Sequence, residues 1–178
     1  MMTLHACFPD KFEVSVVYVD PSMGKSAKNI HCDYSAICFA GWARNTLWID
    51  MDMERRPPTQ ICRDVITMYK KYVPNCIGCE SNGFQSMLAE NLAKMLRESG
   101  LGNVNIFEHN NTINKVLRIS ETLDPYLERG EIKILDNDGG RLLLEQLRDF
   151  PNGIHDDGPD SVQGAITLIM KYLAKEEQ

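Results

Sequence analysis

Apolar residues form short runs in the first third of the chain. The first run, Val14–Val19, stops at Asp20-Pro21, where proline removes a backbone donor and ends a strand. Two more runs of strand character span residues 34–43 and 46–51, and only Arg44-Asn45 joins them. Because so short a connection links antiparallel neighbours, these three segments are predicted to form an antiparallel meander.

The pattern changes after residue 57, where helical periodicity alternates with short apolar runs. Helices are predicted at residues 59–72, 85–99, 114–127, 142–147 and 158–173, and strands at 76–79, 104–107 and 132–135. In the second helix Leu88, Leu92 and Leu96 recur every four residues and so share one face. Three antiparallel strands followed by this alternation predict an α/β fold, with helices on both faces of a mixed five-stranded sheet.

The length of 178 residues suits a single domain, 1–178, with an irregular lead at 1–12 and a solvated tail at 174–178. No apolar stretch approaches the roughly 20 residues of a membrane span, and the N-terminus lacks the pattern of a secretory signal. The six cysteines are scattered through strand-like and helix-like runs. We therefore expect a reduced, cytoplasmic protein that does not enter a membrane.

The net charge of −6 counts against nucleic-acid binding through bulk electrostatics, which usually needs a basic surface. Two explanations remain compatible with such binding. A carboxylate cluster that awaits metal ions would add negative charge that the ions neutralise. A separate partner domain could also bind the nucleic acid.

Acidic residues stand at the ends of the apolar runs. Asp20 and Glu80 each follow a predicted strand, and Asp156, Asp157 and Asp160 precede the last helical run. A desolvated carboxylate costs several kcal/mol unless it is paired or bound to metal. Because the carboxyl ends of the first and fourth predicted strands lie side by side in such a sheet, these acids are expected to converge. Oxygen ligands suit Mg²⁺ or Mn²⁺, and two such ions clamp a phosphodiester, so the acids predict a metal-dependent nuclease.

The acids also have ordinary structural explanations. Asp20 before Pro21 is a common way to open a turn, and Asp156 or Asp157 could cap the last helix. One aspartate is enough for a cap. Asp157 and Asp160 are three residues apart on one helix face, where like charges repel unless a cation lies between them. This pair therefore favours a metal site.

Three other features have simpler explanations than a functional site. Cys76 and Cys79 have the spacing of a zinc or redox pair, but no second pair accompanies them, so we interpret them as small core residues. Gly24-Lys25-Ser26 ends like a phosphate-binding loop, but Val19 stands where that loop needs its first glycine. His155 is interpreted as a hydrogen-bonded neighbour of the aspartates.

Five segments carry a family resemblance: Val19–Ser22, Asp33–Ile37, Glu80–Phe84, Lys115 with Arg118, and Phe150–Asp157 with Asp160. In order and spacing they resemble the C-terminal nuclease domain of phage terminase large subunits. That family has an RNase H-like fold related to RuvC resolvases. The resemblance covers about residues 14–173. Because those subunits carry an upstream ATPase domain and this chain has none, we expect an excised domain or a separately encoded piece.

The resemblance implies roles for individual acids. Asp20, Glu80 and Asp157 would be the catalytic metal ligands, with Asp20 between two Mg²⁺ or Mn²⁺ ions and the others holding one ion each. Asp160 would be an additional ligand one turn along the helix. Asp156 would cap the helix.

The resemblance also implies a substrate and partners. Lys115 and Arg118 would contact the DNA backbone, although the two could instead belong to a solvated helix face. The implied activity is cleavage of double-stranded DNA during viral genome packaging in the host cytoplasm. The implied partners are the ATPase domain of the same motor, the small terminase and the portal protein. The alternatives are a junction resolvase, an RNase H acting on hybrids, and a non-catalytic module that grips DNA or docks to the portal.

Overall fold

The structure of this chain is a computed structural model, and it describes residues 2–21, 34–80 and 85–176. The strands are β1 (Thr3–His5), β2 (Val14–Asp20), β3 (Ser35–Ala43), β4 (Thr46–Glu54), β5 (Cys76–Glu80), β6 (Ile106–His109) and β7 (Ile132–Leu135). The helices are α1 (Pro58–Tyr72), α2 (Gln85–Glu98), α3 (Lys115–Glu128), α4 (Asp138–Asp149) and α5 (Asp157–Glu176).

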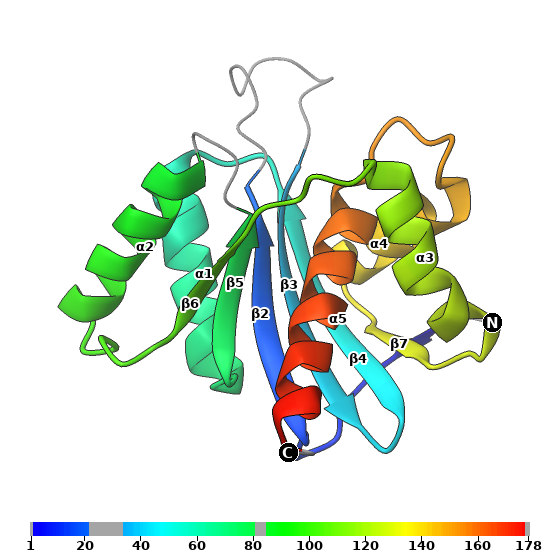
Figure 1. Cartoon of the computed structure of the whole chain (residues 1–178), viewed down its shortest axis with the longest axis horizontal. Coiled ribbons are helices and arrows are strands. Elements are labelled where there is room, and N and C mark those ends of the chain that lie inside the picture. The colour runs from blue at the N-terminus through cyan, green and yellow to red at the C-terminus, as the bar shows by residue number, and fades with distance from the viewer. Residues whose placement is uncertain (1, 22–33, 81–84, 177–178) are drawn as a thin grey trace.

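The strands form one mixed sheet in the order β1-β7-β4-β3-β2-β5-β6 (Figure 1). Strands β2, β3 and β4 make the predicted antiparallel meander, and β5, β6 and β7 join it in parallel pairings. The predicted α/β class is thus confirmed, although the described sheet has seven strands where five were predicted, because β7, itself predicted as a strand at 132–135, and β1 also join it. The short β1 was missed because it lies in the lead at 1–12, and its pairing with β7 joins distant segments.

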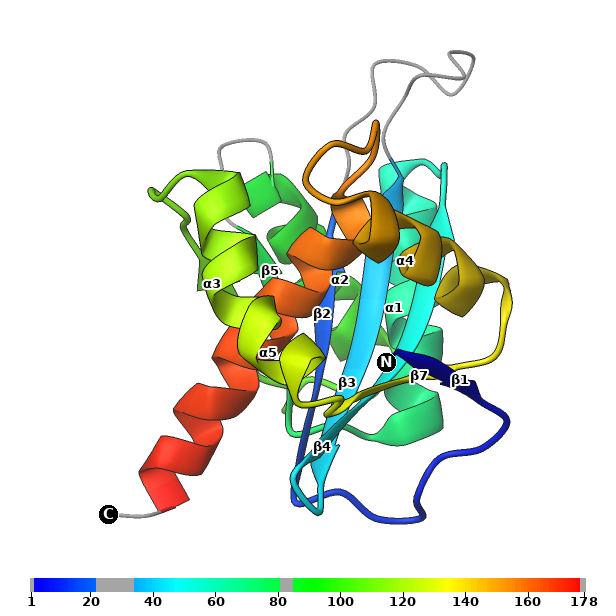
Figure 2. The same cartoon turned by 90° about the vertical axis from the view of Figure 1, so that its right-hand side faces the viewer.

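Helices cover both faces of the sheet, as predicted (Figures 1 and 2). On one face α1 and α2 pack over Val17, Val19 and Phe39, together with other buried apolar side chains. On the other face α3, α4 and α5 enclose a second core that includes Val16 and Tyr18. Because successive side chains of a strand point to opposite faces, fully buried β2 serves both cores. No helix within the described ranges is both long and apolar enough to cross a membrane.

Helix α5 lies directly against the centre of the sheet, over β2 and β3. Gly164 makes this close approach possible, because a Cβ atom there would lie 2.2 Å from the ring of Tyr18. The helix begins at the edge where β2 ends, so its first turn is brought to the end of that strand (Figure 1). This packing places the acids of α5 beside those of the sheet.

Candidate active site

Acidic side chains converge at the carboxyl ends of β2 and β5. Val19 pairs in register with Cys79, so Asp20 and Glu80 follow side by side at one edge of the sheet. The charges of Asp160, Asp157 and Glu80 all act on the carboxyl group of Asp20. The predicted convergence of these acids is therefore present in the structure.

Three of these acids are buried, with exposed fractions of 8% for Asp20, 5% for Asp157 and 6% for Asp160. Burial, followed by the charges of Asp160 and Asp157, raises the pKa of Asp20 well above its usual range. Lys115 acts in the opposite direction but does not cancel these effects. Four further carboxyl groups, those of Glu80, Asp156, Asp157 and Asp160, lie near Asp20 or its neighbouring cations Lys115 and Arg118, and a bound cation would stabilise the ionised forms of these acids.

Two cations from the first turn of α3 lie against these acids. Lys115 Nζ is 2.7 Å from Asp156 Oδ1 and 3.1 Å from Asp160 Oδ2. Arg118 Nη2 is 2.9 Å from Asp160 Oδ1, and the arginine side chain is only 9% exposed. Burial alone would lower the pKa of Lys115, but the charge of Asp160 and the hydrogen bond to Asp156 raise it. Lys115 and Arg118, which were predicted to contact DNA, thus also hold the acids in place. Because Arg118 is buried, it does not belong to a solvated helix face.

Lys115 and Arg118 differ in what they can offer a ligand. The Lys115 side chain is 40% exposed, so its ammonium group remains accessible to solvent beside the acids. Arg118 also donates to Gln163, while its buried Nε has no hydrogen-bond partner among the described residues. Of the two cations, only Lys115 is therefore accessible to a ligand.

The first residues of α5 are held by contacts across the site. Asp157 Oδ2 accepts a hydrogen bond of 3.1 Å from the backbone N–H of Tyr34, just before β3. Asp156 directly precedes α5, at the position predicted for the cap, and its carboxylate accepts from Lys115. The ring of His155 meets the ring of Tyr34 edge-on, with centroids 5.2 Å apart. These contacts fix the approach of α5 to the sheet.

Two residues near Glu80 were not identified from the sequence. Asn111 donates from Nδ2 to Glu80 Oε1 at 3.2 Å, and His109 stands opposite Glu80 in the register of β5 and β6. Burial, then the charges of Lys171 and Arg118, lowers the pKa of His109. The available signal was position, because His109 ends a parallel strand and Asn111 follows two residues later. The predicted strand boundary at 107 fell two residues short of His109.

The donor set fits a hard divalent cation, because it consists of carboxylate oxygens. No three His, Cys, Asp or Glu side chains in the described part of the chain are arranged closely enough to hold a metal ion. Asp160 carries two ion pairs. Metal binding would therefore require the side chains of Asp20, Glu80 and Asp157 to move closer together.

Several predictions concern other positions. Cys76 and Cys79 are buried and unbonded to other cysteines, in agreement with their interpretation as core residues. The Gly24-Lys25-Ser26 segment lies outside the described residues. So do Ser22, Asp33 and residues 81–84, which belong to the segments of the family resemblance.

The sequence matches no protein-family model and no curated protein. The fold is similar to the large terminase nuclease of thermophilic phage G20c with bound zinc. That comparison has a TM-score of 0.64 and 15% identity, over 86% of this chain and 80% of the nuclease. The large terminase of a second thermophilic bacteriophage gives a TM-score of 0.64 at 11% identity, over 94% of this chain and 42% of the terminase.

A resolvase shows a further similarity. The Fowlpox virus resolvase, in complex with its substrate Holliday junction DNA, gives a TM-score of 0.52 at 15% identity. The match covers 90% of this chain and 99% of the resolvase. This chain therefore has the RNase H-like fold of phage terminase nucleases and junction resolvases, as the family resemblance predicted.

Proposed function

We propose that this chain is a metal-dependent endonuclease that cuts double-stranded DNA during viral genome packaging, as the nuclease domain of a large terminase. The observation that carries the proposal is the convergence of Asp20, Glu80 and Asp157 at one sheet edge. The raised pKa of Asp20 supports it, because such a group binds a cation readily in place of its proton. The shared fold with terminase nucleases supports it further.

The proposed roles follow from where each side chain lies. Asp20, at the centre of the acids, would hold the metal together with Glu80 and Asp157. When bound, Mg²⁺ or Mn²⁺ supplies a water of lowered pKa and offsets the charge that develops on the phosphate. Asp160, held by Arg118, keeps the first turn of α5 in position.

Lys115 completes the proposed site. Its ammonium group lies beside the acids and is partly exposed, so it can contact a phosphate of the DNA backbone. Such a contact orients the strand without reading its sequence, so we expect cleavage with little sequence preference. The ATPase domain, the small terminase and the portal protein are the proposed partners.

A plasmid-nicking assay with Mn²⁺ or with EDTA tests the proposal. Wild-type protein should convert supercoiled plasmid to nicked and linear forms only with the metal. Asp20→Asn and Asp157→Asn should abolish this conversion while circular dichroism remains that of the wild type. Asp138→Asn is the matched control, since this aspartate is fully exposed on α4, and it should cut normally. Full activity in Asp20→Asn or Asp157→Asn, or DNA binding without cutting in the wild type, would contradict the proposal.

A junction resolvase is the second candidate function, because the similarity to the Fowlpox virus resolvase spans 99% of that chain. The same acids would serve it. Competition among linear duplex, four-way junction and RNA–DNA hybrid separates the candidates, and the proposed function predicts preferential cutting of the duplex. Preference for the junction would identify a resolvase, and preference for the hybrid an RNase H.

A further inference from the structure

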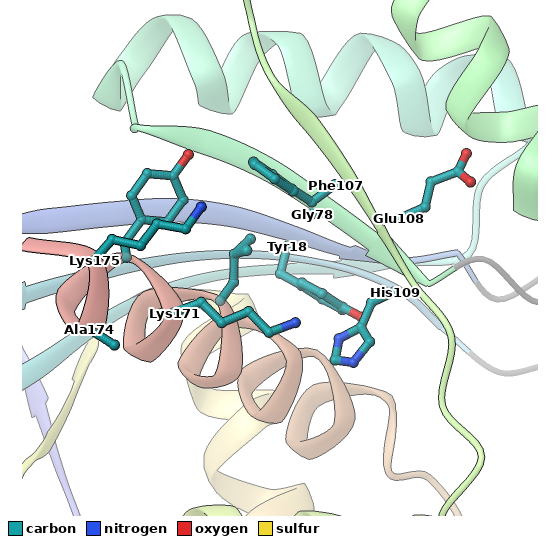
Figure 3. A pocket seen from close by; sticks show the side chains of 10 residues that line it. Tyr18, Gly78, Phe107, Glu108, His109, Lys171, Ala174 and Lys175 are labelled. Carbon is teal, nitrogen blue, oxygen red and sulfur yellow. The ribbon is translucent and has the colours of Figure 1, made fainter. Parts of the chain in front are cut away.

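A pocket lies between the C-terminal half of α5 and the edge strand β6 (Figure 3). Its volume is about 270 Å³. We call it the β6 pocket. Aromatic and cationic side chains dominate its lining, namely Tyr18, Phe107, His109, Lys171, Tyr172 and Lys175.

The floor of the β6 pocket depends on a glycine. Gly78 on β5 lines the pocket, on the face of the sheet that α5 covers. A Cβ atom there would lie 2.8 Å from side-chain atoms of both Leu168 and Tyr18. A larger residue at this position would displace these two side chains. The shape of the hollow therefore depends on the small residue at its floor.

The cations of the pocket come from one side of α5. Lys171 and Lys175 are four residues apart, and both are exposed. Glu108 also borders the pocket, but Figure 3 shows its carboxylate pointing away from the two lysines. Alternation along β6 explains this, because Phe107 and His109 face α5 and Glu108 therefore faces the opposite way. Two lysines therefore border the pocket, although the protein as a whole carries a net charge of −6.

The aromatic side of the pocket is partly open to solvent. Phe107 is 39% exposed, and its ring meets that of Tyr172 edge-on with centroids 6.2 Å apart. An exposed aromatic face beside lysines is the arrangement on which proteins stack the bases of single-stranded nucleic acids. The combination suits a ligand with a flat ring and a phosphate, which is a nucleotide.

The β6 pocket adjoins the acidic site. Tyr18 stands two residues before Asp20, and Gly78 two residues before Glu80, so each pair shares a face of its strand. Two residues of a strand span about 7 Å, which is roughly two base steps at 3.4 Å each. After burial itself, the charges of Glu80 and Asp20 are the main causes that raise the pKa of Tyr18.

We propose that the β6 pocket binds an unpaired nucleotide of the DNA strand whose phosphodiester lies at the acidic site. This inference rests on the proposed function and adds to it a place for a displaced base next to the cut. The base stacks on Phe107, and Lys171 and Lys175 bind the neighbouring phosphate. The volume of about 270 Å³ lies near the lower end of the range for small-ligand pockets, which suits one nucleotide rather than a duplex.

Binding in EDTA tests this inference separately from cleavage. Fluorescence anisotropy would follow a short labelled oligothymidylate, a blunt duplex and, by competition, thymidine monophosphate. Phe107→Ala should weaken oligothymidylate binding by about tenfold, and Phe107→Tyr should bind as the wild type does. Lys175→Ala should reduce the slope of log affinity against log salt by about 0.7. Lys94→Ala, an exposed lysine on α2, is the charge-matched control and should leave the slope unchanged.

Several results would overturn the inference. If Phe107→Ala and Lys175→Ala bind the oligothymidylate as tightly as the wild type does, the β6 pocket takes no part in binding the strand. If Phe107→Ala loses as much affinity for the blunt duplex as for the oligothymidylate, the ligand is not an unpaired nucleotide. If the wild type binds thymidine monophosphate as tightly as the oligothymidylate, the pocket is a site for free nucleotides. An absence of plasmid cutting with intact, Phe107-dependent oligothymidylate binding would contradict the proposed nuclease function while supporting the pocket.

Discussion

The ion pair between Arg118 and Asp160 gives the sharpest prediction about how the acidic site is held together. Both side chains are more than nine-tenths buried, and the nitrogen–oxygen distance is 2.9 Å. With an effective dielectric constant of about 20, their mutual attraction is roughly 6 kcal/mol before desolvation is subtracted. Removing one member of a buried pair usually costs about 3–5 kcal/mol, because the other charge is left uncompensated.

Arg118→Met removes the charge and keeps much of the apolar stem. Lys115 would still pair with Asp160 at 3.1 Å, so the expected loss lies at the low end, about 3 kcal/mol. For a chain of this size the melting temperature should fall by about 6–12 °C. Urea unfolding in EDTA, followed by circular dichroism, measures the loss directly.

Arg141→Met is the matched control for this substitution. Arg141 also pairs with two aspartates, Asp136 and Asp138, but its side chain is 56% exposed. Surface pairs contribute at most about 1 kcal/mol, so the control should lose less than that. Equal losses in Arg118→Met and Arg141→Met would refute the reasoning, because burial of the pair would then have no energetic consequence.

Three further predictions concern charge and packing at the site. Asp20 has a raised pKa in the folded state, so the metal-free protein should lose stability as pH rises from about 4, the unfolded value, through the folded pKa. Asp20→Asn should lack this loss and be more stable than the wild type at pH 8 in EDTA, and thermal melts showing a less stable variant would contradict this. Gly78→Ala should cost about 1–3 kcal/mol in urea unfolding, because its methyl group meets Leu168 and Tyr18, and wild-type stability would show that the floor of the pocket has spare room. Lys115→Met should reduce the salt slope of duplex binding in EDTA by about 0.9, and an unchanged slope would remove this lysine from the DNA contacts.

The sheet and its acids were largely predictable because the relevant signals are local. The apolar run Val14–Val19 is fully buried and ends at Asp20, as predicted. Glu80 likewise ends its strand. Since topology brings the carboxyl ends of neighbouring parallel strands together, the convergence of Asp20 with Glu80 followed from the order of elements alone.

The contacts that hold the site were not predictable, because they join residues far apart in the chain. Lys115 and Arg118 lie on the side of α3 that faces α5, and only the packing of those two helices makes Arg118 a buried partner of Asp160. The contacts of Asp50 were unpredictable for the same reason. It is buried in β4 and receives hydrogen bonds from Lys71 and Asn137, which lie 21 and 87 residues away.

The β6 pocket was missed for a similar reason. Phe107 was predicted in a strand, but its exposure depends on β6 being the edge strand of the sheet. Lys171 and Lys175 belong to a helix whose direction across the sheet cannot be inferred from its own periodicity. The hollow therefore arises from how α5 crosses the strands and not from any local motif.

The most direct measurement of the central claim is anomalous diffraction from crystals soaked in Mn²⁺. The account predicts ions among the carboxylates of Asp20, Glu80 and Asp157, with none in a crystal of Asp20→Asn soaked in the same way. Mn²⁺ bound elsewhere, or an acidic edge that stays without metal while these side chains keep their present positions, would contradict the claim.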